Sequence, residues 1–280
     1  MSRSLTAGIF YPSDPQELKE LLTSSFLTYT EQLSLPGAIM IPHAAYEYVL
    51  PLYEEAFSPY IQSEPERIIL LAPLHAEILK EDSPKTIFIP SYASMSTPLG
   101  ELTIDQDLCE QLDGVHQLIG YGDHYFDEET SIELALPPIQ HLFGDTPIIP
   151  ILTGEISAKT SSVLSSIITP LVDGKTLIII SMNQCGWERR ELIAPLQSNL
   201  RGALEDMTPE KRPHLIQMYR DKQITSCGTT LLDALHRSGL YTDHWHLSQT
   251  HIPDSDRLVD DTRTTAFASG YLPLELPHES

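Results

Sequence analysis

Five short, continuously apolar runs constrain the fold of this chain more than any other feature of its sequence. Each run is rich in Ile or Leu, a pattern that favours strands buried on both faces of a sheet over strands with one solvated face. Three of the five end at a proline. The runs are 38–42, 68–73, 87–90, 148–152 and 177–181.

Segments with helical patterns separate these runs. The first is the clearest, because Asp14 can cap the helix and Pro15 suits its first position. Alternating strands and helices predict an α/β fold, with helical layers covering a central, largely parallel or mixed sheet. We expect one domain over 1–280, with a core at about 7–270 and a mobile tail at 271–280. The helical candidates are 14–33, 104–112, 131–143, 156–172, 188–207 and 227–239.

The charge balance excludes two classes of partner. The net charge of -22, from 39 acidic and 17 basic residues, argues against nucleic acid and against an anionic membrane surface, both of which need a basic footprint. No apolar run is long enough for a membrane-spanning helix, and no leader pattern opens the sequence. Three widely spaced cysteines predict no disulfide framework and favour a cytoplasmic location.

Two histidines follow strand-like runs directly. His43 follows the run 38–42, and His75 comes just after the run 68–73. Functional side chains of open α/β sheets gather beyond the carboxyl ends of the strands. If the two strands are neighbours, both imidazoles can reach one metal ion. The alternative is that each histidine caps a strand or packs under a helix.

Two cysteines also lie at element boundaries. Cys227 lies at the expected start of the helix 227–239, where the helix dipole favours the thiolate. The alternative is a buried structural cysteine. Cys185 follows the run 177–181, but no histidine or carboxylate accompanies it there, and the nearby Trp187 either lines a pocket or belongs to the core.

An acidic cluster, "GDHYFDEETSIEL", combines His124 with Asp127, Glu128, Glu129 and Glu133. Such a group can form a metal or acid/base site. It can equally be a helix start, and we favour that interpretation, with Thr130 or Ser131 as the N-cap. For Glu133 a role in orienting a ligand histidine stays open. A second histidine group, "HWHLSQTH", is predicted to be an edge strand and a loop, with a metal site there as the less favoured alternative.

Eight ordered motifs resemble the Memo family, whose microbial members are called AmmeMemoRadiSam system protein B. The resemblance extends from about residue 7 to about 270, and it implies a fold similar to class III extradiol ring-cleaving dioxygenases. The motifs are "AGIFYPSDPQELKELL" (7–22), "PHAAYEYV" (42–49), "APLHAE" (72–77), "STPLGELTID" (96–105), "TSIELALP" (130–137), "PIIPILTG" (147–154), "IIISMNQCGW" (178–187) and "SCGTTLLDAL" (226–235).

The resemblance implies that His43, His75 and Cys227 form a metal pocket, with Fe(II) as the first choice, Cu or Zn as alternatives, and a metal-free site as a further one. Departures from the family pattern cluster around this pocket. The positions concerned are Ala45, Thr130, Ala135, Asn183 and Gly186. Glu133 and Asn183 stay as candidate supporting residues.

Three functions are compatible with these residues. The leading hypothesis is a metal-binding, dioxygenase-like oxidoreductase with a degenerate pocket. The second is a catalytically silent scaffold that binds a peptide or small molecule, and the third is a hydrolase with Cys227 as nucleophile and His43 as base. By family resemblance, radical SAM and AMMECR1-like proteins are candidate partners. Local basic pairs occur at Arg189–Arg190 and Lys211–Arg212.

Overall fold

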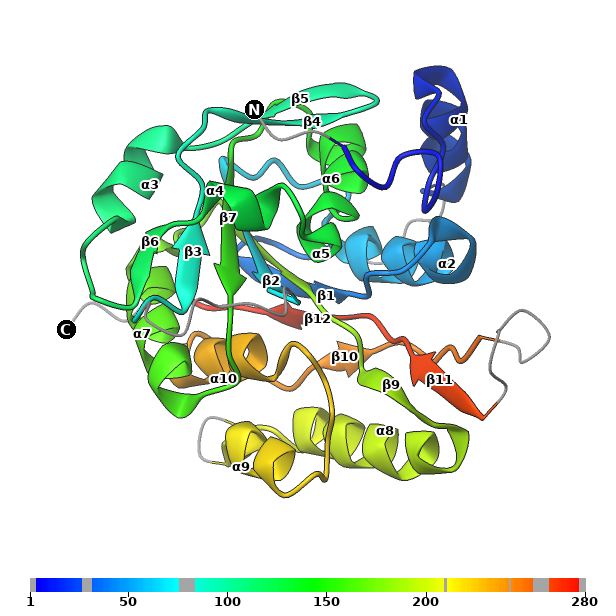
Figure 1. The fold of residues 1–280 in the computed structure, drawn as a ribbon, viewed down its shortest axis with the longest axis vertical. Helices are drawn as coiled ribbons and strands as arrows, with labels where there is room; N and C mark the ends of the chain where they lie inside the picture. The colour runs from blue at the N-terminus through cyan, green and yellow to red at the C-terminus, as the bar shows by residue number, and fades with distance from the viewer. Residues whose placement is uncertain are drawn as a thin grey trace.

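An eight-stranded sheet forms the centre of the molecule (Figure 1). The computed structural model describes residues 4–26, 32–75, 84–208, 211–241, 243–253 and 262–276. The strand order is β10-β12-β1-β8-β2-β7-β3-β6. These strands are β1 (Gly37–Ile41), β2 (Arg67–Pro73), β3 (Ile87–Ile89), β6 (Ile119–Tyr121), β7 (Ile148–Thr153), β8 (Thr176–Ser181), β10 (His246–Leu247) and β12 (Gly270–Pro273).

The middle of the sheet is parallel. β1, β8, β2 and β7 pair in parallel in that order, while β12 and β3 join them in antiparallel orientation. Every residue of β1, β7 and β8 is buried, as continuous apolar runs predict for strands covered on both faces. All five strands expected from the sequence are present, and the α/β class with a mostly parallel sheet is confirmed.

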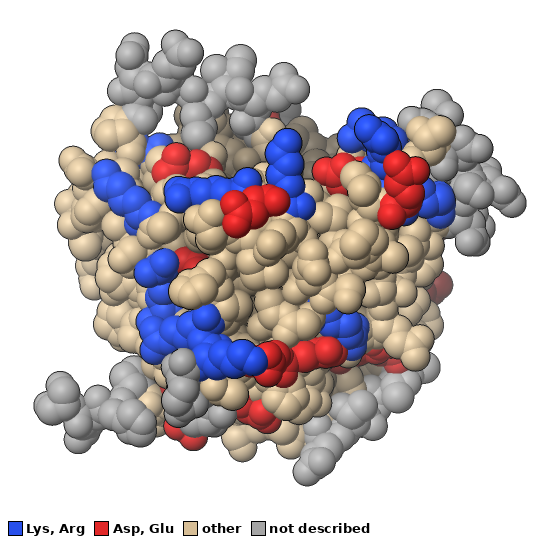
Figure 2. Space-filling model, turned by 90° about the horizontal axis from the view of Figure 1, so that it is seen from below, with Lys and Arg blue, Asp and Glu red and all other residues tan. Residues whose placement is uncertain are grey.

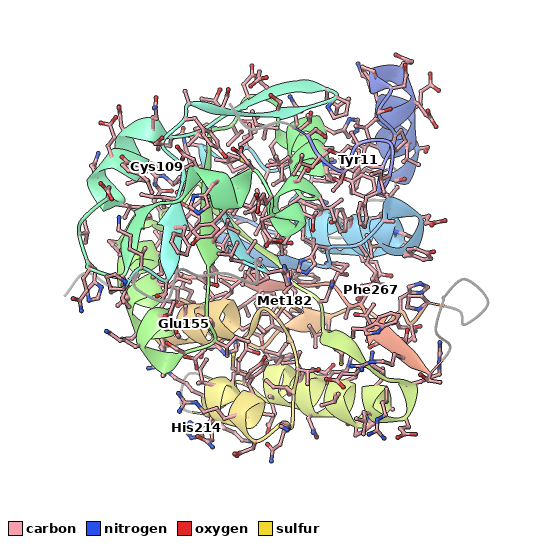
Figure 3. The ribbon with its side chains drawn as sticks, viewed as in Figure 1. Tyr11, Cys109, Glu155, Met182, His214 and Phe267 are labelled. Atoms are coloured by element: carbon pink, nitrogen blue, oxygen red, sulfur yellow. The ribbon has the colours of Figure 1, made fainter. Side chains whose placement is uncertain are left out.

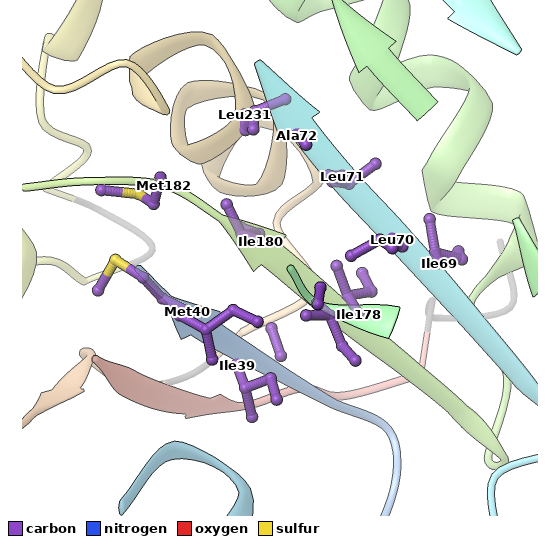
Figure 4. Close-up of a cluster of buried hydrophobic side chains, with 14 of the residues drawn as sticks. Ile39, Met40, Ile69, Leu70, Leu71, Ala72, Ile178, Ile180, Met182 and Leu231 are labelled. Carbon is purple, nitrogen blue, oxygen red and sulfur yellow. The ribbon is translucent and has the colours of Figure 1, made fainter. Parts of the chain in front are cut away.

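Aliphatic side chains of these strands form the core. Figure 4 shows Ile39 of β1, Leu70 of β2 and Ile178 of β8 among them, and all three are fully buried. Burying an aliphatic side chain contributes about 1.5–3 kcal/mol each, so this cluster is the main favourable contribution to folding.

Helices cover the sheet on both sides (Figure 1). α2 packs on β1 and β12, and α5 packs on β2, whereas α7 and α10 pack together on the opposite side, where α10 contacts β2. The helices are α1 (Pro15–Ser25), α2 (Tyr46–Phe57), α3 (Gln106–Leu112), α4 (Asp123–Phe126), α5 (Thr130–Glu133), α6 (Leu136–Phe143), α7 (Ala158–Ile168), α8 (Arg190–Glu205), α9 (Leu215–Arg220) and α10 (Thr229–Ser238), with 3-10 turns η1 (Ser58–Tyr60) and η2 (Thr169–Leu171).

Two small ribbons lie outside the central sheet. β4 (Ser94–Thr97) pairs with β5 (Gly100–Thr103), and β9 (Cys185–Arg189) pairs with β11 (Arg263–Ala266). α8 packs against the β9–β11 ribbon. Within the described ranges, no helix combines the length and apolar character needed to span a membrane.

The first helix begins as its sequence predicts. Asp14 Oδ1 accepts a hydrogen bond from the N–H of Glu17 at 2.9 Å, and Pro15 occupies the first helical position. The expected range 14–33 was too long at its end, because α1 stops at Ser25; residues 27–31 lie outside the described part of the chain.

Three other boundaries differ from the sequence prediction. The helix expected over 131–143 is divided into α5 and α6, and its N-cap is Glu129, not Thr130 or Ser131. The first residues of the helix expected over 188–207 belong to the strand β9. The helix α2 was not predicted at all. The prediction of a mobile tail was wrong for 271–273, which pair with β1 as part of β12; residues 277–280 lie outside the described ranges.

His236 of α10 is a buried titratable group in the fold. Its side chain is 2% exposed, and its Nε2 accepts a hydrogen bond from Trp245 Nε1 at 3.2 Å. Its Nδ1 has no hydrogen-bond partner among the described residues. Burial, reinforced by the nearby Arg212 guanidinium, lowers the pKa of His236 from 6.5 to about 3, so folding requires the neutral ring.

Neutral burial of His236 predicts acid destabilisation. In the unfolded chain the ring takes up a proton below pH 6.5, whereas in the folded chain it does so only near pH 3. Because of His236, the free energy of unfolding therefore decreases by up to about 1.4 kcal/mol per pH unit as the pH falls through this window. The variant His236→Gln, measured by urea unfolding at several pH values, should show a shallower loss. The exposed His214→Gln is the control, and parallel pH profiles for wild type and His236→Gln would contradict the assignment.

Candidate metal centre

Three parallel strands end at the same edge of the sheet and carry the site. His43 lies two residues beyond β1, His75 lies two residues beyond β2, and Ser181 is the last residue of β8. β1 and β2 are not neighbours, because β8 lies between them. The histidines still meet, because both side chains reach over the end of β8.

His43, His75 and Cys227 converge on one point. One potential ligand atom from each lies within 4.8 Å of the other two, and among the described residues only this group brings three such atoms together. Cys227 Sγ is 3.6 Å from His43 Nε2, and the two imidazole centres are 5.0 Å apart. The His75 side chain is 47% exposed, so the site opens to solvent on that side.

Ser181 orients the ring of His43. Its hydroxyl donates its single proton to the carbonyl oxygen of Ser131 at 2.7 Å, and its oxygen lies 3.0 Å from His43 Nδ1. Because the hydroxyl proton is already used, His43 must donate its Nδ1–H to Ser181. His43 Nε2 is therefore the nitrogen that faces Cys227.

Glu129 orients the ring of His75 in the same way. Its carboxylate accepts from His75 Nδ1 at 3.0 Å, from the His75 backbone N–H at 2.6 Å and from the Ser131 backbone N–H at 3.0 Å. Glu129 is 5% exposed. Burial alone would raise the pKa of Glu129, but its bonds to His75 and Ser131 hold that pKa below its usual value. A buried carboxylate behind an imidazole is the usual support of a metal-ligating histidine.

Cys227 lies just ahead of α10, as the sequence predicts, and is partly buried. The following residue must be small, since a Cβ on Gly228 would lie 2.5 Å from the Cβ of Met182, which comes after β8 at the same sheet edge (Figure 3). The backbone N–H of Asn183 donates to Cys227 Sγ at 3.2 Å. Burial raises the pKa of Cys227, but His43 and His75 outweigh burial and lower it to about 6.

The metal-free site is a thiolate with protonated imidazole beside it. Burial disfavours charge on His75, yet its bonds to Cys227 and Glu129 raise the pKa of His75 to about 10. A metal ion needs the Nε2 lone pair, so binding near neutral pH displaces this proton.

Glu133 does not support the ligands. Among the described residues, the hydrogen bonds to its carboxylate come from the N-terminal segment, including the Tyr11 hydroxyl at 2.7 Å and the Thr6 backbone N–H at 2.9 Å. Asn183, by contrast, lies at the site. Its side chain accepts from the His43 N–H at 3.0 Å and donates to the His43 carbonyl oxygen at 3.3 Å.

The other candidates lie elsewhere. His124 is exposed, and its ring lies against that of Tyr125 at a tilt of 39°. Cys185 is fully buried in β9, where burial raises its pKa to about 12. Trp187 is 48% exposed and so is not part of the core.

The structure also places the other residues of the acidic cluster and the remaining positions that the sequence analysis singled out around the pocket. Asp127 and Glu128 are exposed, Thr130 begins α5, and Ala135 is buried between α5 and α6. Ala45 is the N-cap of α2, and Gly186 belongs to β9.

The prediction of an edge strand in the second histidine group, "HWHLSQTH", is confirmed. His246 lies in β10 at the sheet edge, and His244 pairs with Asp243 at 2.7 Å. His251 pairs through its backbone with Phe267.

Sequence reasoning missed Glu129, Ser131 and Ser181 as supporting residues. Glu129 stood in the acidic cluster, but nothing in the local pattern separates it from Glu128 or from Glu133. Ser181 is the last residue of a predicted strand, and in the sequence it is adjacent to none of the three candidate ligands. Only the strand order, which places β8 between β1 and β2, reveals its position under His43.

A cleft of about 420 Å³ opens beside two of the ligands. Its walls include His75, Cys227, Glu155 and Tyr219. A larger hollow of about 730 Å³ lies between α1 and α2 and is lined by none of the three candidate ligands. Small molecules therefore have a path to His75 and Cys227 through the smaller cleft.

Comparison with known proteins finds relatives described as Memo proteins. The "MEMO1 family protein" of Sulfolobus acidocaldarius is 25% identical over 238 residues, covering 79% of this chain and 81% of its own. The "Protein memo-1 homolog" of Caenorhabditis elegans is 27% identical over 192 residues, covering 68% of this chain and 53% of its own, so the match spans about half of that relative.

One solved structure and one family model also match. The structure is an uncharacterized protein of Escherichia coli, with a TM-score of 0.49 and 12% identity, covering 84% of this chain and 98% of that one. The model of the family described as "Memo-like protein" matches residues 3–237, which is well over half of the 280 residues. The chain belongs to the Memo-like family.

Proposed function

We propose that the chain binds a transition metal, Fe(II) in the first place, through His43 Nε2, His75 Nε2 and Cys227 Sγ. One observation carries the proposal: each Nδ1 is already held by an acceptor, so both Nε2 atoms face the Cys227 thiolate. Two imidazoles and one thiolate also suit Cu and Zn, which are the alternatives.

Three protein ligands leave coordination positions for a small molecule, and the 420 Å³ cleft gives access to them. A bound redox-active metal supplies electron transfer or Lewis-acid chemistry there, which makes an oxidoreductase the enzymatic form of the proposal. The chain itself contributes orientation. Ser181 and Glu129 hold the imidazoles, and the Asn183 N–H stabilises charge on Cys227.

The second candidate is a silent binding protein. Both ends of the Asn183 amide are used by the backbone of His43, and Gly186 has no side chain to move a proton. Positions 183 and 186 therefore supply no group that carries a proton, which suits binding as well as it suits catalysis.

Metal content tests the leading proposal. Reconstituted wild-type protein should hold about one equivalent of Fe(II), and His43→Ala and Cys227→Ser should hold about a tenth of that or less, since two protein ligands bind a transition metal poorly. His124→Ala removes an exposed histidine outside the site and is the matched control. Elemental analysis after desalting gives the readout. Equal metal content in all four proteins would contradict the proposal.

The support by Glu129 gives a second prediction. Glu129→Gln keeps the size of the side chain but loses the charge behind His75. Metal affinity, measured by competition with a chromophoric chelator, should fall about 10–100-fold. The control is Glu128→Gln at the exposed neighbour, and an equal affinity in both variants would show that Glu129 does not tune the site.

The close contact between Cys227 Sγ and His43 Nε2 also fits a cysteine nucleophile with a histidine base, the third candidate. In metal-stripped protein, iodoacetamide should modify Cys227 with a midpoint near pH 6, as its lowered pKa requires. Burial raises the pKa values of Cys109 and Cys185 to about 12, so mass spectrometry should find both unmodified. Added Zn should protect Cys227. A midpoint at or above about 8.5, that of an ordinary thiol, would contradict the thiolate assignment.

A further inference from the structure

A second hollow, of about 600 Å³, adjoins the metal cleft. The two share three wall residues, Ile156, Tyr219 and Thr225. A molecule that fills the second hollow therefore lies against the same Tyr219 as one that approaches His75 and Cys227. We call the second hollow the annex.

The annex is basic in a strongly acidic protein. Arg189, Arg220 and Lys222 line it, with Glu188 as the opposing acid. Seven of the 17 Lys and Arg residues fall within 185–222, against six of the 39 acids. Figure 2 shows the molecule from the side of α8 and α9, where Lys and Arg side chains lie interspersed with acidic ones.

Two of the three cations carry no ion pair. Arg189 pairs with Glu191 at 3.2 Å. Among the described residues, Arg220 and Lys222 take part in none of the salt bridges, and both are exposed at the wall of the annex. Unpaired cations beside an apolar surface are available to an anionic ligand.

Lys222 occupies a backbone position that favours glycine. α9 ends in a Schellman motif, in which Gln223 N–H donates to the Met218 carbonyl oxygen and Lys222 N–H donates to the Tyr219 carbonyl oxygen. The residue at Lys222 has φ 57°, a conformation that glycine adopts freely and lysine only with strain. Glycine would end the helix at lower energy but would place no cation in the annex.

Apart from Thr225, the rest of the lining is apolar. Ile156, Leu192, Leu196 and Ile224 form it together with the Tyr219 ring. A fully hydrated inorganic anion gains nothing from such walls, whereas an organic anion buries its hydrocarbon part against them. The large negative charge of the whole chain leaves nucleic acid a poor occupant.

We propose that the annex binds the carboxylate or phosphate group of a small organic anion through Arg220 and Lys222, with the apolar body of that molecule lying along Tyr219 towards the metal cleft. The proposal deepens the proposed metal function by naming the class of its ligand, and it rests on that function for the direction in which the ligand extends. Anion binding itself does not require the metal.

Calorimetry on the full chain tests the annex with three probes: benzoate, phenyl phosphate and the uncharged benzamide. At least one anion should bind saturably, and at least about tenfold more tightly than benzamide, because only the anion uses the cations. The tighter of the two anions identifies carboxylate or phosphate as the group recognised. The absence of saturable anion binding, or equal affinity for benzamide, would overturn the proposal.

Variants separate recognition from structure. Arg220→Gln and Lys222→Gln should each weaken the anion by about fivefold or more, and Lys19→Gln on the distant α1 should leave it unchanged. Lys222→Gly is the sharper test, because relief of the strained φ should raise Tm while anion affinity falls. If Lys222→Gly binds the anion as wild type does, the assignment is wrong.

Each titration is run on metal-stripped and on metal-loaded protein. Anion binding to protein that takes up no metal would leave the annex standing while the metal proposal fails. Metal uptake without anion binding would give the reverse result.

Discussion

A single proton on the Ser181 hydroxyl determines how the site is arranged. Because that proton is donated to the Ser131 carbonyl oxygen, the oxygen of Ser181 can only accept from His43. Ser131 in turn donates its N–H to Glu129, which holds His75. Neighbouring strands are about 4.8 Å apart, so His43 and His75 start from strands separated by twice that distance. The start of α5 bridges the gap and makes the two histidines one site.

The hydrogen bonds of Asn183 require an amide side chain. An amide accepts at Oδ1 and donates at Nδ2, so it can hold both the N–H and the carbonyl oxygen of His43. An aspartate in that place could accept but not donate. The amide therefore fixes the loop that bears His43 and keeps the ligand geometry, but it supplies no carboxylate at this position to carry a proton.

The elements that could be predicted well are those that residues of the same segment determine. The buried strands could be predicted because a continuous apolar run indicates a strand covered on both faces without knowledge of its partner strands. The start of α1 could be predicted from Asp14 and Pro15. α2 was missed because its sequence carries Pro51 inside the helix and lacks a side-chain N-cap.

The site was predictable in part for the same reason. Family-matched positions indicated His43, His75 and Cys227, but the supporting residues depend on strand order. Glu133 was chosen over Glu129 because the family pattern draws attention to it, whereas the hydrogen bonds of each carboxylate are set by which segments the fold brings to it.

The attachment of the N-terminal segment to Glu133 links the beginning of the chain to the site. Residues 4–11 place donors from Ser4, Thr6 and Tyr11 around a carboxylate that is 6% exposed, at the end of the same short helix whose start holds His75. A shortened or refashioned N-terminus would leave that carboxylate buried without its donors, which is costly, and would loosen α5 from its far end. Substitutions at Ser4, Thr6 or Tyr11 would thus act on the imidazole of His75 from a distance, through α5.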